Sequence, residues 1–238
     1  MGRAHEVRKQ SMEKTAAMKS AIYGRAAKEI YMAAKNGSDP SANLALRSAI
    51  DKAKSNQVPA DVIQRAIKRA EGGDAESYAE NRYEGYGAGG SMVIVDSLTS
   101  NVNRAIAEIR DAFNKNGGKI AQTGAVSHSF NSISLFIFAA TNKDVEATLE
   151  LLMETDAEVN DVFEEDENTV IYGAFQSFNV IKKALDDAGI TEYVKAETTM
   201  IPSEYVDLNE EDKAKFEKMI NKLNELEDVQ NVYHNVNM

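Results

Sequence analysis

The sequence predicts an α+β protein in which a basic N-terminal three-helix domain precedes two ferredoxin-like α/β domains, one inserted in the other. Charge divides the chain: residues 1–73 hold 14 lysine and arginine residues against 7 acidic ones, and the remainder holds 13 against 31. Strand-like and helix-like stretches alternate after residue 91. In the middle of that region their order is β-α-β-β-α-β, which is the ferredoxin-like order.

Three helices are expected in the basic part. Residues 11–35 have apolar side chains within one arc at helical spacing, and Asn36-Gly37 is a stop signal. A second helix is expected from an N-cap at Asp39 to about Ser55. Val58-Pro59 opens a third helix, which ends at Gly72-Gly73. The three helices can bury their apolar stripes against one another.

Lysine and arginine lie mostly away from those stripes. A single such residue ordinarily solvates a helix surface, but an excess over the whole segment, beside an acidic remainder, indicates an anionic partner. Clustered cations neutralise phosphates, so we expect nucleic acid to bind here. No zinc-finger, bZIP or RNP signature chooses between DNA and RNA. The candidate nucleic-acid-binding residues are Arg3, Arg8, Lys9, Lys14, Arg25, Lys28, Lys52, Lys54, Arg65, Lys68 and Arg69.

A glycine-rich stretch, residues 82–91, separates the basic and acidic parts. Its segment Gly85-Tyr-Gly87-Ala-Gly89-Gly90 satisfies G-x-G-x-x-G. The dinucleotide fingerprint requires a helix directly after the glycines, and here a β-branched run from Ser91 to Leu98 reads as a strand. We therefore expect a close-packed turn and no cofactor. Tyr83 and Tyr86 either join the core, which is the commoner role, or stack on bases.

The acidic part is expected to form the two α/β domains. A strand at 91–98, a helix from Asn101 to the Gly117-Gly118 turn and a strand at 125–130 form the first β-α-β half. The inserted unit has strands at 134–140, 158–164, 169–175 and 192–201, with helices at 143–154 and 177–188. A strand at 204–208, a helix at 209–226 and a strand at 230–236 complete the chain. The expected domains are residues 1–79, residues 80–131 together with 203–238, and residues 132–202.

Composition excludes several classes of protein. There is no cysteine, so disulfides and thiolate chemistry are absent. No apolar run approaches the ~18 residues of a membrane helix, and the first residues lack the apolar core of a signal peptide. We expect a cytoplasmic protein with no membrane partner.

No catalytic or metal site is expected. His5, His128 and His234 are not spaced as a metal pair, and the latter two read as structural histidines in strands. The acidic run from Asp161 to Glu167 lacks the EF-hand pattern and reads as a solvated hairpin turn. No nucleophile elbow, phosphate-binding GK[ST] or H-E-x-x-H motif occurs. The chain is interpreted as a non-enzyme, and an enzyme that uses converging carboxylates is a distant alternative.

Several long motifs, in order, resemble the YebC/PmpR family, which includes the mitochondrial translational activator of cytochrome c oxidase. They are Asp39-Pro40, the stretches 43–53 and 58–73, the loop Tyr83-Glu84-Gly85-Tyr86-Gly87-Ala88-Gly89-Gly90, Asn101-Val-Asn103-Arg104 and Gly117-Gly118. Family members typically open with a lysine-dense segment similar to Gly-His-Ser-Lys-Trp and have a proline where this chain has Ala88. In these respects the chain is similar to the YeeN-type paralogue.

The resemblance implies a helical domain and two α/β domains, the middle one split in sequence. It also implies one of two activities. The first is that of a DNA-binding transcriptional regulator. The alternative is a ribosome-associated translation factor that binds ribosomal RNA and assists synthesis of difficult, proline-rich stretches. Both activities place nucleic acid on the basic helices.

Overall fold

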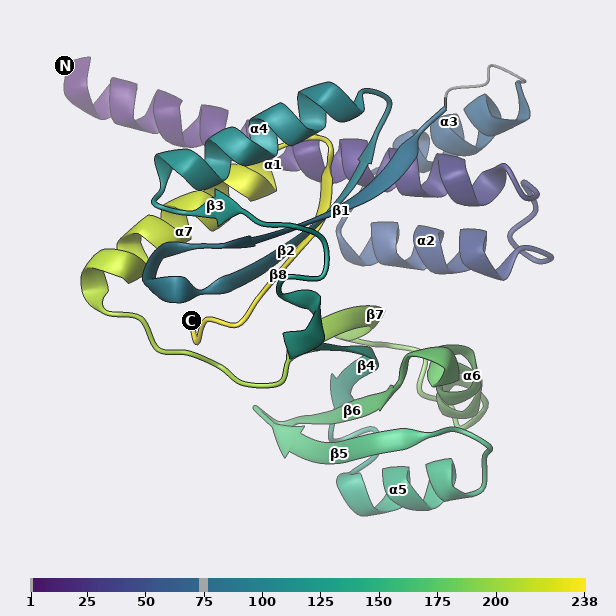
Figure 1. The fold of residues 1–238 in the computed structure, drawn as a ribbon. Coiled ribbons are helices and arrows are strands. Elements are labelled where there is room, and N and C mark those ends of the chain that lie inside the picture. The colour runs from purple at the N-terminus through teal and green to yellow at the C-terminus, as the bar shows by residue number, and fades with distance from the viewer. Residues whose placement is uncertain (1, 73–76) are drawn as a thin grey trace. The chain divides into compact units, whose positions relative to one another are not determined.

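The computed structural model describes residues 2–72 and 77–238, and the side chains of the first helix from residue 18 onward. Contacts divide the chain into two units, Met1–His128 with Glu204–Met238, and Ser129–Ser203. The first unit holds helices α1 (Gly2–Ala34), α2 (Leu44–Ser55) and α3 (Ala60–Glu71), followed by an α/β region (Figure 1). The finer division of this unit into a helical and an α/β domain stays a prediction.

The helices begin where side chains or proline fix the backbone. The Asn43 side chain accepts a hydrogen bond from the Leu46 backbone N–H at 3.0 Å and so caps α2. The expected start at Asp39 is wrong, because its carboxylate accepts from the Ser41 N–H and hydroxyl at 2.9 and 2.7 Å and forms a separate turn. Pro59 precedes α3, as the sequence predicts.

Apolar residues of the three helices form one core. Ile30 of α1, Leu46 and Ala53 of α2, and Ile63 and Ala66 of α3 are all buried in it. These are the stripes that the helical period predicts. The core leaves the opposite sides of α2 and α3 exposed, and those sides carry the cations discussed below.

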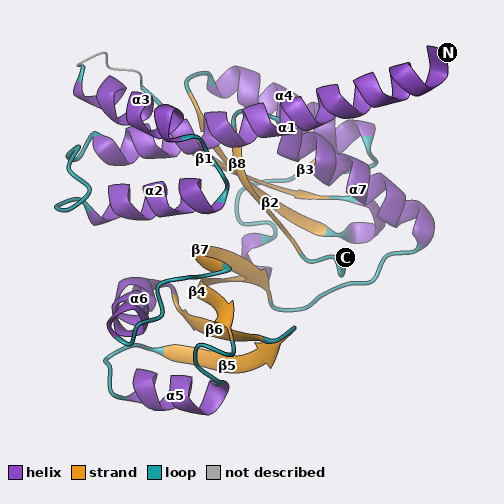
Figure 2. Cartoon of the chain, turned by 180° about the vertical axis from the view of Figure 1, so that it is seen from behind, coloured by secondary structure: helices purple, strands orange, loops and turns teal. Residues whose placement is uncertain are grey.

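The α/β region of the first unit is an antiparallel sheet in the order β3-β1-β2-β8, covered by two helices. Its strands are β1 (Ala79–Tyr86), β2 (Met92–Thr99), β3 (Lys119–Ile120) and β8 (Val229–His234). Helices α4 (Val102–Lys115) and α7 (Glu210–Glu225) lie against one face (Figures 1 and 2). Val93, Val95, Phe113, Phe216 and Met219 form the core between them.

Two expected strands of this region are not formed. Residues 125–129 make a turn and the short helix η2 (Ser127–Ser129), because backbone N–H groups there donate to the Glu84 carboxylate rather than to a neighbouring strand, and only Phe130 is in a strand, as the first residue of β4. Residues 204–208 contribute a single parallel bridge, from Val206 to Val236. Conversely, the sequence prediction missed β1, which contains Tyr83 to Tyr86, including the first motif glycine, Gly85. Strand β2 follows the glycines after the short helix η1 (Ala88–Gly90), as expected.

The second unit has the β-α-β-β-α-β order that the sequence predicts. Its elements are β4 (Phe130–Ala139), α5 (Val145–Met153), β5 (Val159–Glu165), β6 (Asn168–Ala174), η3 (Phe175–Ser177), α6 (Phe178–Asp187) and β7 (Lys195–Pro202). The antiparallel sheet has the order β5-β6-β4-β7. Phe136 and Ile171 of the sheet pack with Leu152 of α5 and Ile181 of α6. The predicted fold class, N-terminal helices followed by two antiparallel sheets, is confirmed for the described residues.

Candidate nucleic-acid interface

Five basic residues of α2 and α3 are exposed to solvent, and one of them, Arg69, lies over the Tyr31 ring. We call Arg47, Lys54, Arg65 and Lys68 the α2–α3 cationic face. Arg47 and Lys54 are seven residues apart on α2, so they project from the same side of that helix. Arg65 and Lys68 are three residues apart on α3 and are likewise neighbours. Such a surface can contact phosphates at several points.

Local contacts hold two of these guanidinium groups without burying them. Arg47 donates from Nε to the Pro40 carbonyl at 3.2 Å, which extends the side chain along the loop before α2. Arg65 pairs with Asp61 at 2.7 Å, but the two side chains are 73% and 69% exposed. A pair this exposed is worth under about 1 kcal/mol, so a phosphate can compete for Arg65.

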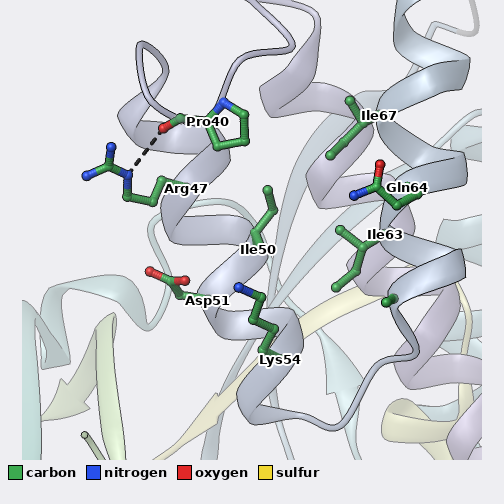
Figure 3. A pocket seen from close by; sticks show the side chains of 9 residues that line it. Pro40, Arg47, Ile50, Asp51, Lys54, Ile63, Gln64 and Ile67 are labelled. Carbon is green, nitrogen blue, oxygen red and sulfur yellow. Dashed lines mark hydrogen bonds between the residues drawn. The ribbon is translucent and has the colours of Figure 1, made fainter. Parts of the chain in front are cut away.

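A groove of about 290 Å³ runs between α2 and α3, and Arg47 and Lys54 of the cationic face line it. Ile50, Ile63 and Ile67 supply its apolar floor (Figure 3). The Gln64 side chain extends from α3 toward the space between the helices, and Lys54 lines the groove from α2 (Figure 3). Sequence reasoning missed this groove, because the spacing within each helix does not reveal how the two helices face each other.

Two predicted surface cations of α1 are instead internal contacts. Lys28 is only 7% exposed, and its ammonium donates to Asp228 Oδ1 at 2.7 Å and to the Glu227 carbonyl at 3.2 Å. Arg25 is half-buried and donates to the Asn224 carbonyl. Their expected position on the outward face of α1 is wrong, because that side packs against the end of α7 and the segment after it.

Asp228 is the centre of this internal contact. Arg104 also donates to it, from Nη2 to Oδ2 at 2.7 Å, and the Asp228 side chain is 3% exposed. Burial by itself would raise the pKa of Asp228, yet hydrogen bonds from Lys28, Arg104 and Thr99 hold it below the ordinary value. The aspartate is therefore ionised and links α1 to the α/β region. No spacing in the sequence pointed to it.

The remaining candidate cations have other surroundings. Lys52 pairs with Glu29 at 3.2 Å and is partly buried. Arg69 lies over the Tyr31 ring, 4.9 Å from its centroid, and donates to the Tyr78 hydroxyl at 2.9 Å. The side chains of Arg3, Arg8, Lys9 and Lys14 lie outside the described residues. Arg47, which was not among the eleven candidates, joins the surface because of its spacing from Lys54.

The glycine-rich loop of the family motif has a structural function. The buried Glu84 carboxylate accepts from the backbone N–H groups of Gly124, Val126 and Ser127 at 2.8, 2.7 and 2.9 Å. Burial opposes ionisation, but these donors lower the pKa of Glu84 below its ordinary value. Tyr83 packs against the hydrophobic core, which is the commoner of its two expected roles.

At each motif glycine a side chain would either clash with a neighbour or strain the backbone. A Cβ on Gly85 would lie 2.6 Å from the Phe113 ring and 2.7 Å from the Lys119 carbonyl. Gly87 is crowded in the same way, by the Ser91 hydroxyl at 2.6 Å. Gly89 and Gly90 have φ of +64° and +76°, which glycine adopts at little cost. This close packing is the turn that the sequence predicts. Tyr86 ends β1 and donates its hydroxyl to the Ala125 carbonyl at 3.1 Å.

Two further features, a metal site and a membrane-spanning helix, were considered for residues 2–72 and 77–238. Among these residues, no cluster of His, Asp and Glu could hold a metal ion. Within the same residues no helix is long and apolar enough to cross a membrane. His234 of β8 accepts from the Val236 N–H at 3.3 Å and contacts the Phe216 ring edge, and burial lowers its pKa.

The fold and the exposed cations together define a class: proteins with an N-terminal helical region, basic on one side, followed by two antiparallel sheets. The chain belongs to the TACO1/YebC family. Residues 3–73 match the family's model of the "TACO1/YebC protein N-terminal domain", and residues 78–236 match that of the "TACO1/YebC second and third domain". The predicted resemblance to the YebC family is confirmed.

Full-length relatives agree with this assignment. The chain is 56% identical to "Probable transcriptional regulatory protein Mfl546" of Mesoplasma florum, over 99% of each chain. It is 44% identical to a "Probable transcriptional regulatory protein" of Alcanivorax borkumensis, over the whole of both. Among solved structures, the conserved hypothetical protein Aq1575 from Aquifex aeolicus matches with a TM-score of 0.77 and 34% identity, over 92% of this chain and 90% of that one.

Proposed function

We propose that this protein is a non-enzymatic, DNA-binding regulator of transcription that acts in the cytoplasm and contacts DNA through the α2–α3 cationic face. The observation that carries the proposal is the placement of Arg47, Lys54, Arg65 and Lys68 as exposed side chains on adjacent helices. Relatives across their full length are named probable transcriptional regulatory proteins, which supports the regulatory part.

The distribution of charge along the chain favours binding of nucleic acid at the helical region. Phosphate contacts by lysine and arginine supply most sequence-independent affinity for nucleic acids. Residues 74–238 hold 31 acidic residues against 13 basic ones, so the α/β regions repel the phosphate backbone. The helical region is therefore the part of the chain that a polyanion approaches.

Ribosomal RNA is the second candidate partner. The same cations neutralise RNA phosphates, and the groove beside them suits an unpaired base, which ribosomal RNA offers and continuous duplex DNA does not. Under this alternative the protein acts on the ribosome as a translation factor. Sequencing both the RNA and the DNA that copurify with the protein distinguishes the two: discrete genomic sites support the regulator, whereas enriched ribosomal RNA supports the translation factor.

The cationic face is tested by the salt dependence of binding. A triple variant, Lys54→Ala, Arg65→Ala and Lys68→Ala, should weaken binding to every sequence about equally. The slope of log K against log salt should fall by about 2 to 3, roughly one per lost phosphate contact. Fluorescence anisotropy of labelled DNA and RNA over a salt series measures this slope.

A matched variant controls for the change in net charge. Lys115, Lys183 and Lys215 are each in an i,i+4 ion pair outside the helical region, as Arg65 is within it. Their combined replacement by alanine removes the same charge and should leave the slope unchanged. Equal slopes for wild type and the α2–α3 variant would refute the proposed surface.

A further inference from the structure

The groove between α2 and α3 combines features that suit a flat, polar ring. Its floor is aliphatic, formed by Ile50, Ile63 and Ile67. At about 290 Å³ it is at the lower end of ligand-pocket volumes, so it has room for one ring system rather than a large cofactor. An apolar slot of this kind is how proteins hold a base taken out of its stack.

Polar groups lie at the opening of the groove. Gln64 extends its side-chain amide toward the space between the helices (Figure 3), and this amide can both donate to and accept from a base edge. Lys54 lines the groove from α2, and its side chain runs along that helix toward Asp51 (Figure 3). Arg47 and Asp51 line the same groove from α2, so its opening carries one carboxylate beside the two cations.

The charge around the groove identifies the occupant. An apolar peptide side chain would fill the isoleucine floor equally well, but it brings no negative charge for Lys54 and Arg47, which outnumber Asp51 in the lining. A nucleotide supplies both parts, a base for the floor and phosphates for the cations. A fully paired duplex cannot supply the base, because its rings are stacked inside the helix.

We propose that the α2–α3 groove is a binding site for one unpaired nucleobase, and that Lys54 and Arg47 bind the phosphates on either side of it. The proposal rests on nucleic-acid binding by the same surface and specifies its substrate class: a strand with an unstacked nucleotide, in a bulge, a loop or a single-stranded segment. Isoleucines on both helices enclose the base, and Gln64 reads its edge.

The experiment compares two duplexes that differ in one nucleotide. One is fully paired, and the other carries a single bulged 2-aminopurine, whose fluorescence reports its surroundings. The full-length protein should bind the bulged duplex about tenfold more tightly and should change the 2-aminopurine fluorescence on binding. Measurements at several salt concentrations separate the base contribution from the phosphate contribution, which is common to both duplexes.

Two variants test whether the groove is responsible. Ala60→Phe places a ring into the groove from the start of α3, and Ala45→Phe makes the same change at an exposed alanine of α2 that does not line it. Ala60→Phe should abolish the preference for the bulge and retain binding to the paired duplex, and Ala45→Phe should behave as wild type. Gln64→Leu, which keeps the side-chain size, should reduce the preference about threefold.

The outcomes distinguish this proposal from the one it rests on. Equal affinity of wild type for both duplexes, or a bulge preference that Ala60→Phe leaves intact, overturns the base site while nucleic-acid binding stands. Failure to bind either duplex overturns both. A preference lost in Ala60→Phe and kept in Ala45→Phe supports the site.

Discussion

Replacement of Asp228 by asparagine tests the buried contact between α1 and the α/β region. In the wild type the Asp228 carboxylate faces both Lys28, at 2.7 Å, and Arg104, at 2.7 Å. The side chains of Lys28 and Asp228 are 9% and 3% exposed. Asp228→Asn keeps the shape of the residue and removes the charge, so the buried Lys28 ammonium loses its close counter-ion and keeps only the largely exposed Glu227 carboxylate, at 3.7 Å.

The expected loss of stability depends on the hydrogen-bond acceptors that remain around the Lys28 ammonium. Removal of one partner from a buried ion pair destabilises proteins by about 3–5 kcal/mol. The asparagine oxygen and the carbonyls of Leu98 and Glu227 can still accept from Lys28, so we expect the lower end, about 3 kcal/mol. Opening of the α1 contact should therefore become about 100-fold more frequent.

Hydrogen exchange of residues 18–34 measures this opening directly. Amides of that part of α1 should lose about 100-fold protection in Asp228→Asn, while those of β4 and β6 in the second unit stay unchanged. Asp111→Asn is the matched control, because it removes an exposed i,i+4 pair with Lys115 and should change protection less than tenfold.

A double variant tests the physical cause. Lys28→Met combined with Asp228→Asn leaves no buried unpaired ammonium, so it should recover at least 1 kcal/mol relative to the sum of the single changes. Additive losses, or unchanged α1 protection in Asp228→Asn, would show that the ion pair does not hold α1.

The pH dependence of the same contact has a definite sign. The pKa of Asp228 is lowered in the folded protein, so its contribution is complete above the unfolded value of about 3.9 and is lost as the pH falls through the lower folded value. Protection of α1 should therefore be constant between about pH 5 and 7 and fall below about pH 4. Asp228→Asn should lack this acid step.

Three further changes probe the α/β region of the first unit. Glu84→Gln removes the charge that three backbone N–H groups share and should cost about 2–4 kcal/mol in urea unfolding, with faster proteolysis near residue 124. Gly85→Ala should cost about 1–3 kcal/mol by overpacking, whereas Gly72→Ala, whose Cβ would meet nothing closer than 3.6 Å, should be neutral or stabilising. Because burial lowers the pKa of His234, stability should be complete above about pH 6.5 and decline as the pH falls through the lower folded value; His234→Phe should remove that decline.

The second unit was predictable because each of its elements carries its own signal. Strands β4 and β6 are apolar runs, and α6 has a clear apolar stripe. The turn between β5 and β6 falls at Asp166 and Glu167, inside the acidic cluster that the sequence assigned to a hairpin. Local patterns and tertiary packing agree here, so the order of elements could be predicted from sequence alone.

The errors occur where one side chain from a distant part of the chain overrides a local pattern. Val126 favours a strand, yet Glu84, about 40 residues earlier, accepts the N–H groups of Val126 and Ser127 that a strand would use. Lys28 lies opposite the apolar arc of α1 and therefore looks exposed. Because α1 is packed on two sides, against α2 and α3 and also against the residues around Asp228, a single amphipathic stripe could not describe it.

This second packed side also determines which cations remain for a ligand. Lys28 and Arg25 are buried or half-buried and donate to Asp228 and to the Asn224 carbonyl, so they hold α1 in place rather than present charge to a ligand. The count of basic residues in 1–73 therefore overstates the charge that a phosphate meets. Of the cationic face, Arg47 and Lys54 line the groove, and Arg65 and Lys68 are exposed elsewhere on α3. Binding should accordingly depend far more on Lys54 and Lys68 than on Lys28, whose loss should act through stability.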